Sequence, residues 1–321
     1  MAITVGVLRG GPSREHEVSL KSGAAMLAGL PADKFNARDI YIDKTGQWHD
    51  RGRPVTPSRA LRQIDVALIA LHGEYGESGE VQQMLVLHGI PFAGADAFGT
   101  QQARHKAIGK ALAVNAGVRT PAFRYVECRE SAETAAQDAT RAFHQPVVVK
   151  PVGWGSSVGV SIVGGYVAIL AAVQALFDEG ADGVLIEERI RGREATAGII
   201  ENFRNQALYA LPVVEIVPPA DDFFSYESKY SGASREICPG NFLPEETQAL
   251  QEAAKTMHQA LGQRHYSRSD FIVSPRGVYY LETNSAAAVG LTSESLLPKS
   301  LAAIGCKFPD FLSHLVTCAQ A

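Results

Sequence analysis

Polar side chains near the C-terminus alternate along two apolar runs that have the pattern of a β-hairpin. The runs cover residues 268–274 and 278–284, and both are rich in β-branched and aromatic residues. A three-residue loop, 275–277, would end in a glycine, which readily takes the left-handed conformation such a loop needs. Such a loop pairs Ser274 with Val278. Because strand side chains repeat every two residues, it puts four polar side chains on one face: Arg268, Asp270, Glu282 and Asn284.

This register places two carboxylates directly across from each other. Asp270 faces Glu282, and the amide of Asn284 lies beside them. Like charges in that arrangement destabilise a sheet, so a bound cation explains the pair better than a plain surface hairpin does. Carboxylate and amide oxygens suit Mg²⁺ that is held partly through a substrate's phosphates. The other face would pack on the core through Phe271, Val273, Tyr279 and Leu281.

Length and composition are those of an ordinary globular protein. The chain has 321 residues, 46% of them hydrophobic and 20% charged, which is enough for two or three domains. A net charge of -4 supplies no strong field for nucleic acid or acidic membranes. The four cysteines lack metal-site spacing, and the N-terminal run lacks the features of a signal peptide. We therefore expect a cytoplasmic protein with no nucleic-acid or membrane partner.

Strand and helix patterns divide the chain into three units. Residues 1–94 alternate strands with helices, as in a parallel α/β sheet, whereas 95–183 and 184–321 have an α+β pattern. A segment without periodicity, 218–239, has the length of a functional lid. The expected strands are 4–8, 37–42, 66–71, 90–93, 123–126, 146–150, 158–163, 184–188, 195–200 and 208–216, and the expected helices are 18–30, 81–88, 100–116, 132–143, 166–177 and 245–261.

A glycine-rich turn follows a buried strand in the second unit. Lys150 ends the strand, and Gly-Trp-Gly-Ser-Ser-Val-Gly at 153–159 leads into the next strand. Small residues let backbone N–H groups approach an anion, and a lysine at the strand end supplies a charge for phosphate. A flexible hairpin turn explains the glycines alone equally well.

Three glutamates fit a ligand site, although each also fits a simpler role. Glu187 could accept from an exocyclic amine and Glu194 from a ribose hydroxyl, but a charged linker explains that segment better on composition alone. Glu15 starts a helix after a Gly-Gly pair and could hold an ammonium group. Charges at a helix start are common in any protein.

Taken in order, the motifs of this chain resemble those of the D-alanine:D-alanine ligase family of ATP-grasp enzymes, over essentially its whole length. The resemblance implies that residues 1–94 form a substrate-binding domain and that 95–183 and 184–321 clamp ATP. The matching motifs are Gly10-Gly11 with Glu15 and Glu17-Val18-Ser19, Leu71-His72-Gly73, Val149-Lys150-Pro151, Gly155 to Gly159, Glu187 with Glu194, Tyr226 to Tyr230, Arg268-Ser269-Asp270 and Glu282-Thr283-Asn284.

The resemblance also implies which residues bind ATP and its metal. Asp270, Glu282 and Asn284 would hold two Mg²⁺ ions, with Mn²⁺ as an alternative. The phosphates would contact Lys106, Lys150 and Lys229, and Lys150 would also lie within reach of the adenine. Residues at the adenine and ribose would be Glu187, Ile190, Glu194, Ile272 and Leu281.

A further set would bind the amino acids and stabilise the reaction. Glu15 would hold the first ammonium group with Val18 and His72 nearby, and would form a hydrogen-bonded network with Ser156 and Tyr230. The oxyanion would be stabilised by Arg268 and the N–H of Gly290, and the second D-alanine would be held by Ser295 and Leu296.

These roles imply a ligase that supplies a peptidoglycan precursor. ATP would convert one D-alanine to an acylphosphate, and the amine of a second D-alanine would displace phosphate to give the dipeptide. The family commonly forms homodimers.

The sequence departs from the family pattern at three places. Arg104-His105 precedes Lys106 where an acidic residue is usual, and Gly153-Trp154 replaces a charged pair. The run 285–292 lacks a Pro-Gly turn and is two residues longer. Since this run borders the second substrate's site, an ATP-grasp ligase with a different second amino acid is the alternative, although the pair at 229–230 favours dipeptide over depsipeptide formation.

Two other classes fit the sequence less well. A nicotinamide-dependent dehydrogenase would explain the strand, Gly10-Gly11 and helix, but these glycines do not form G-x-G-x-x-G. A nucleotide-binding module without catalysis would not need all three presumed metal ligands together with Arg268.

Overall fold

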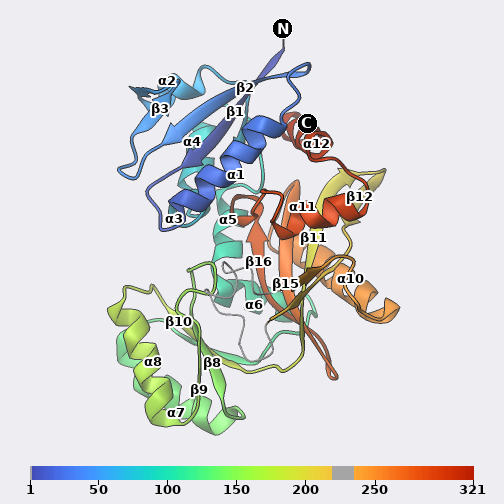
Figure 1. Cartoon of the computed structure of the whole chain (residues 1–321). Coiled ribbons are helices and arrows are strands. Elements are labelled where there is room, and N and C mark those ends of the chain that lie inside the picture. The colour runs from blue at the N-terminus through green and yellow to red at the C-terminus, as the bar shows by residue number, and fades with distance from the viewer. Residues whose placement is uncertain (1, 219–234) are drawn as a thin grey trace.

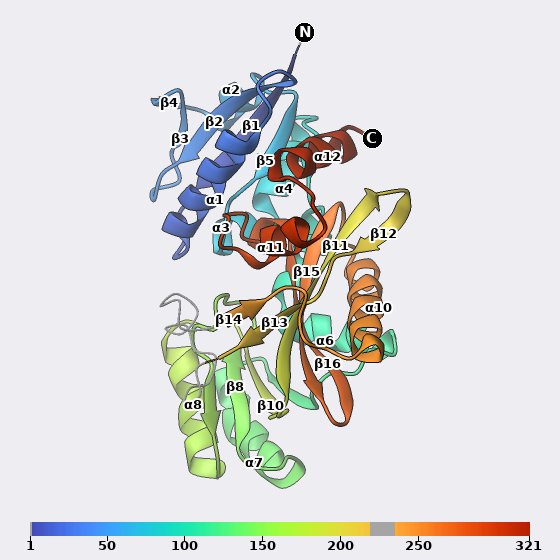
Figure 2. The same ribbon diagram turned by 45° about the vertical axis from the view of Figure 1, so that its right-hand side comes forward.

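The computed structural model describes residues 2–218 and 235–321 and arranges them around three sheets (Figure 1). The N-terminal sheet lies at one end of the molecule and the second sheet at the other, with the third sheet between them (Figure 1 and Figure 2). Within the described ranges, no helix is both long and apolar enough to cross a bilayer.

The first sheet has strand order β4-β3-β2-β1-β5-β6. Its four predicted strands are present and parallel, while β3 and β4 add an antiparallel edge. The sequence pattern missed this edge because each strand has only three residues, joined at Arg51 and Gly52, both with positive φ. The elements are β1 (Ile3–Gly10), α1 (His16–Gly29), β2 (Phe35–Ile42), β3 (Trp48–Asp50), β4 (Arg53–Val55), α2 (Pro57–Leu61), β5 (Val66–Ile69), α3 (Glu74–Glu77), α4 (Glu80–Leu87) and β6 (Phe92–Ala93).

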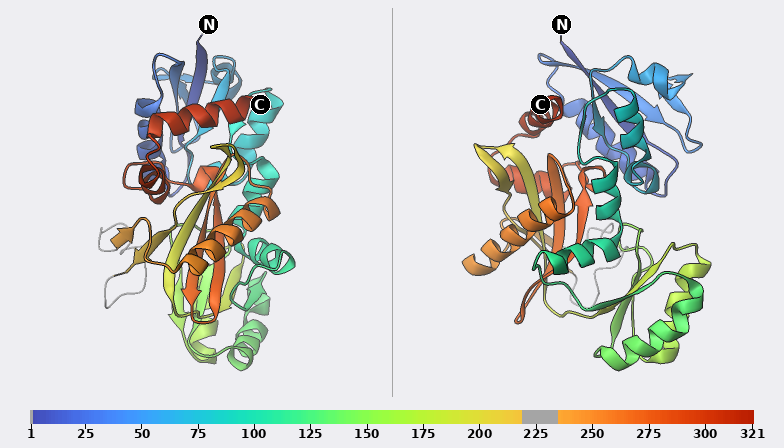
Figure 3. Two further views of the ribbon diagram at one scale, coloured as in Figure 1. Left: turned by 90° about the vertical axis from the view of Figure 1, so that its right-hand side faces the viewer. Right: turned by 180° about the vertical axis from the view of Figure 1, so that it is seen from behind.

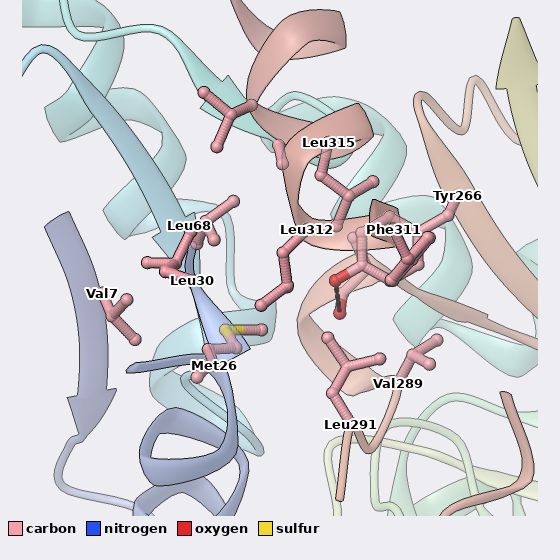
Figure 4. Close-up of a cluster of buried hydrophobic side chains, with 14 of the residues drawn as sticks. Val7, Met26, Leu30, Leu68, Tyr266, Val289, Leu291, Phe311, Leu312 and Leu315 are labelled. Carbon is pink, nitrogen blue, oxygen red and sulfur yellow. Dashed lines mark hydrogen bonds between the residues drawn. The ribbon is translucent and has the colours of Figure 1, made fainter. Parts of the chain in front are cut away.

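The C-terminal helix returns to cover this first sheet. Figure 4 shows Leu312 and Leu315 of α12 (Phe308–Gln320) in one apolar cluster with Met26 of α1 and Leu68 of β5. All four side chains are buried. The first and last segments of the chain therefore share one core, which fixes the N-terminal sheet relative to the third sheet.

The second sheet is antiparallel and has strand order β7-β10-β8-β9. Helices α7 and α8 pack against it through its main apolar cluster. Its last strand begins only at Ser161, because the predicted start at Val158 lies in a turn before Gly159, whose φ is +74°. The elements are β7 (Phe123–Val126), η1 (Arg129–Ser131), α7 (Ala132–Ala142), β8 (Val147–Pro151), β9 (Ser161–Val163), α8 (Tyr166–Asp178) and β10 (Val184–Glu188).

The third sheet has strand order β14-β13-β11-β15-β16, with β12 also paired to β11. Helices α5 and α6 lie along β16, as the view from behind in Figure 3 shows. The elements are α5 (Ala97–Arg104), α6 (Lys106–Asn115), β11 (Arg193–Phe203), β12 (Gln206–Ala210), β13 (Val214–Val217), β14 (Arg235–Ile237), α10 (Pro244–Ala260), β15 (Tyr266–Ser274), β16 (Gly277–Ser285), η2 (Ala286–Ala288) and α11 (Leu296–Ala303).

Two predicted elements are each divided in the structure. The predicted helix 100–116 breaks at His105, whose backbone is extended and whose Nδ1 accepts a hydrogen bond from the N–H of Ile108, so that it caps the second helix. The predicted strand 208–216 divides near Pro212, and its halves pair with different stretches of β11. In each case the break lets the two parts of the segment pack against different neighbours.

The predicted pairing of the hairpin is confirmed at its inner end and wrong at its outer end. Asp270 lies opposite Glu282, but Ser274 pairs with Gly277, so the turn has two residues rather than three. A bulge between Asp270 and Phe271 absorbs the difference.

The bulge changes which side chains of β16 face the core. Tyr280 packs beside Phe271 and Val273 in the apolar cluster, whereas the prediction put Tyr279 and Leu281 there. Tyr279 instead pairs with Ile272 on the other face, and Leu281 is also turned away from that cluster.

A buried histidine joins the first sheet to the third. His265 precedes β15, and its Nδ1 accepts a 2.9 Å hydrogen bond from the N–H of Gly94, just after β6. Burial lowers the pKa of His265 to about 4, with the charge of Arg264 acting in the same direction. A protonated Nδ1 could not accept the bond from Gly94.

We expect His265→Asn to make the free energy of unfolding less dependent on pH below 6.5. Because the folded pKa lies below the ordinary 6.5, this group stabilises the fold above pH 6.5 and loses that contribution as pH falls toward 4. The wild type should lose roughly 2 kcal/mol more than the variant between pH 6.5 and 5. Urea unfolding at both pH values measures this difference. Asparagine tolerates the positive φ of this position, and exposed His144→Asn is the control; equal slopes for wild type and His265→Asn would refute the assignment.

Candidate active site

A cavity of about 350 Å³ lies between the second and third sheets. This is within the usual size range of small-molecule sites. Strands β8 and β10 form one wall, and β11 and the hairpin β15–β16 form the other. The following residues singled out from the sequence line this cavity: Lys106, Lys150, Glu187, Ile190, Glu194, Asp270, Ile272, Leu281 and Glu282.

One part of the cavity wall combines apolar side chains with a buried charge cluster. Glu187 Oε1 lies 2.9 Å from Lys150 Nζ and 3.2 Å from Lys110 Nζ. Lys110 also donates a 3.0 Å hydrogen bond to Thr120 Oγ1. Burial lowers the pKa of Lys110 to about 8, although the charge of Glu187 opposes this shift. The cluster holds a carboxylate and an amine beside apolar side chains. Such a site could bind a flat ring, with the apolar residues against its faces and the polar groups at its edges.

Lys110 was missed in the sequence, although a signal for it exists. It follows Lys106 by four residues, so both lie on one face of α6. The spacing alone does not mark Lys110 as a site residue, because its role depends on Glu187, which belongs to a strand of another sheet.

Hydrogen bonds and ion pairs surround the acidic face of the hairpin. Arg268 Nη2 lies 3.0 Å from Asp270 Oδ2, and Asn284 Nδ2 donates to the same oxygen at 3.0 Å. Lys106 Nζ lies 3.1 Å from Glu282 Oε2. Basic side chains thus offset the two facing carboxylates in the protein itself, which weakens the inference that their repulsion alone demands a cation.

The donor chemistry of this face nevertheless fits Mg²⁺. Asp270, Glu282 and Asn284 carry carboxylate and amide oxygens, the ligands that hard cations prefer. Across 2–218 and 235–321, no three His, Cys, Asp or Glu side chains gather as a metal site. A cation here would therefore take further oxygens from a ligand, as Mg²⁺ does with phosphates.

The glycine-rich turn approaches both the cavity and the N-terminal unit. Ser157 lines the cavity, while Ser156 Oγ donates a 2.7 Å hydrogen bond to Glu15 Oε1. Both serines have left-handed backbone angles, with φ of 53° and 60°. Such strain persists only where the surroundings hold it and is common at ligand sites.

The predicted residues of the N-terminal unit lie on two neighbouring loops. Ser13 Oγ donates to the backbone oxygen of His72 at 2.7 Å, which brings the loop of Glu15 beside that of His72. His72 Nε2 lies 2.8 Å from Ser22 Oγ, and burial lowers the pKa of His72 to about 4. Val18 lies in the first turn of α1 and is half-buried.

A second carboxylate near Glu15 was not found from the sequence. Glu77 accepts a 2.8 Å hydrogen bond from the N–H of Gly73. Burial raises the pKa of Glu77 to about 7, and the charge of Glu15 adds to the shift. The available signal was its place five residues after His72, at the end of α3, the short helix that follows β5.

The residues predicted for the second substrate meet after the hairpin. Ser295 Oγ lies 2.9 Å from Thr292 Oγ1, and a Cβ added to Gly290 would come within 2.7 Å of Ser295 Oγ. Leu296 starts α11. Neither this group nor Arg268 lines the 350 Å³ cavity. Lys229 and Tyr230 lie outside the described residues.

Comparisons with known proteins identify the family. Models of the D-ala D-ala ligase N-terminus and C-terminus match residues 4–57 and 112–317. The chain is 38% identical to a D-alanine–D-alanine ligase of Syntrophobacter fumaroxidans, with 99% of this chain and 97% of the relative covered. It is 36% identical to that of Geobacter sulfurreducens, with 98% and 94% covered.

Solved structures agree with these relatives. The D-alanine–D-alanine ligase of Bacillus anthracis complexed with ATP has a TM-score of 0.81 at 28% identity and covers 99% of this chain and 98% of its own. The VanG D-Ala:D-Ser ligase of Enterococcus faecalis has a TM-score of 0.87 at 28% identity and covers 99% and 100%. The predicted α/β class and ATP-grasp fold are confirmed, and the chain belongs to the D-alanine–D-alanine ligase family.

Proposed function

We propose that this chain joins two D-alanine molecules into D-alanyl-D-alanine while ATP is converted to ADP and phosphate. The cavity that ends in the acidic hairpin face carries this proposal, because it places a nucleotide-sized space beside oxygen ligands and a phosphate-type turn. Family membership supports the same reaction. The product is a precursor of peptidoglycan.

The reaction needs activation because an amine does not displace oxide from a carboxylate. Transfer of the γ-phosphoryl group to the first D-alanine gives an acylphosphate and ADP. The amine of the second D-alanine then attacks the acyl carbon, the C–N bond forms, and phosphate leaves as the tetrahedral intermediate collapses. Bound Mg²⁺ would neutralise phosphate charge during the first transfer.

The cavity supplies distinct contacts for ATP. The adenine would lie beside Ile272 and Leu281, and Glu187 would accept a hydrogen bond from its exocyclic amine. Glu194 would bind the ribose. Lys106 and Lys150, both on the cavity wall, would hold phosphates. Asp270 and Glu282 at the polar end, with Asn284 hydrogen-bonded to Asp270, would be the ligands of two Mg²⁺ ions, or of Mn²⁺ in their place.

The loops outside the cavity would bind the amino acids. Glu15 would hold the first ammonium group, with His72 and Val18 beside it. The oxyanion would be stabilised by Arg268 and Gly290, and Ser295 and Leu296 would position the second amino acid. Tyr230 would complete the proposed network of Glu15 and Ser156, and Lys229 would add a phosphate contact; both lie outside the described residues.

A different second substrate is the alternative, and two observations favour testing it. The run 285–292 departs from the family pattern, and the similar VanG structure is that of a D-Ala:D-Ser ligase. Phosphate release and product mass, measured with ATP, Mg²⁺ and D-alanine alone or with D-serine, D-lactate or L-amino acids, distinguish these cases. If D-alanine alone gives neither ADP nor dipeptide while a mixed pair does, the proposal is wrong.

We further propose a cytoplasmic homodimer. The cytoplasm is proposed because its substrates, ATP and D-alanine, are metabolites of that compartment. The dimer is proposed because the described surface exposes apolar side chains on two adjoining helices. Val86 and Leu87 of α4 are 63% and 84% exposed, and Phe98 of α5 is 70% exposed. Light scattering of the purified protein should give twice the chain mass, and Leu87→Glu should reduce it to one chain.

A further inference from the structure

The loop before α1 touches the glycine-rich turn at two neighbouring residues. Glu15 accepts the hydrogen bond from Ser156, as described above. Arg14 contributes a second contact, because its guanidinium carbon lies 4.8 Å from the centroid of the Trp154 ring. That distance is within the range of a cation–π interaction. One side of the turn is thus attached to the N-terminal unit by a polar bond and a stacked pair.

Trp154 is fixed by the surrounding protein as well as by Arg14. Its carbonyl accepts a 2.6 Å hydrogen bond from Lys106 Nζ, and its ring packs on the apolar cluster of the second sheet. Gly159 has a φ of +74°, and a Cβ there would lie 3.2 Å from ring carbons. Because Trp154 also lines the cavity, anything that holds its ring also holds the edge of the proposed ATP site.

We propose that Arg14 and Trp154 form a latch that positions the glycine-rich turn for the phosphates of ATP. The latch occupies one of the two positions where Gly153-Trp154 departs from the charged pair expected before Gly-Ser-Ser. It links the loop that would bind the first amino acid to the turn that would bind ATP. The inference rests on the proposed function. Both residues are positioning residues, because their part is to hold the turn.

A simpler role for Arg14 would be to attract ATP by its charge, and the chain offers a matched control. Lys44 and Arg14 line the same surface depression. Lys44 pairs with exposed Glu17 at 3.3 Å and has no described contact with Trp154. Lys44→Ala therefore removes an equal charge from the same surface without removing the stack.

Steady-state kinetics with ATP and D-alanine test the latch. Arg14→Ala and Trp154→Leu should each raise KM for ATP about two- to fivefold, the value of one cation–π contact, with kcat little changed. The double variant should be no worse than the more affected of the two single variants. Arg14→Lys should regain part of the loss, and Lys44→Ala should match the wild type. Additive single effects, or an equal effect of Lys44→Ala, would overturn the proposal.

Tryptophan fluorescence provides a test that does not need turnover. Trp154 is one of two tryptophans, so Trp48→Phe leaves it as the only one. In that background, Arg14→Ala should increase quenching of Trp154 by acrylamide and weaken binding of a non-hydrolysable ATP analogue with Mg²⁺ about two- to fivefold. Unchanged quenching would contradict the stack. If the wild type instead forms no dipeptide while these shifts appear, the proposed function fails and the latch stands.

Discussion

Replacing Glu282 with glutamine is expected to lower kcat by about 10³-fold, since a metal ion contributes several kcal/mol of transition-state stabilisation. Glu282 lines the cavity and faces Asp270 across the hairpin. Glutamine has nearly the same shape but lacks the charge that neutralises a divalent cation. Phosphate release over a range of Mg²⁺ concentrations measures both the loss of rate and the shift in metal requirement.

Glu188→Gln is a matched control for this change. Glu188 also lines the cavity, but its carboxylate pairs with Arg276 at the turn of the hairpin. Its replacement should leave kcat within about threefold of the wild type, because a partly exposed ion pair contributes little. Full turnover of Glu282→Gln at ordinary Mg²⁺ concentrations would mean that the acidic face serves only to pair with Lys106 and Arg268.

In the hairpin, the sequence predicts the facing pair of acidic residues correctly but assigns some of the neighbouring side chains to the wrong face. Alternation places Asp270 opposite Glu282 wherever the register holds, and the structure has that pairing. Alternation carries no information about a bulge, which moved Leu281 from the predicted core face to the cavity. The resemblance to the family, which relies on aligned positions rather than on register, placed Leu281 beside the adenine.

Residues whose role depends on a distant partner were the ones that escaped prediction. Lys110 matters because Glu187 of another element lies 3.2 Å away, and Glu77 because Glu15 is near. The return of α12 to the first sheet is a similar case, since the apolar face of this helix does not indicate which sheet the helix covers. Local patterns determine elements, whereas packing between elements determines which charges become buried.

Replacing Arg268 with alanine is expected to lower dipeptide formation by about 10²–10³-fold, the usual loss when one oxyanion donor is removed. Arg268 is bound to Asp270 through two hydrogen bonds, of 3.1 and 3.0 Å, which hold its guanidinium in place. Lysine cannot form this paired geometry, so Arg268→Lys should recover little of the rate. Arg276→Ala is the control on the same hairpin, because that side chain is 58% exposed at the turn.

The partial reactions separate an oxyanion role of Arg268 from an effect on the metal site. Losing Arg268 also leaves Asp270 with one positive partner fewer, which could disturb Mg²⁺ and hence both steps. If Arg268 acts on the tetrahedral intermediate, reversible acylphosphate formation should persist within about tenfold of the wild type, while dipeptide formation falls by the full 10²–10³. Scrambling of ¹⁸O between the bridging and non-bridging positions of ATP measures the first step. Isotope scrambling and dipeptide formation both require the metal-dependent phosphoryl transfer. An equal fall in both rates, with a raised Mg²⁺ requirement, would therefore mean that Arg268 acts by supporting Asp270 rather than by stabilising the oxyanion.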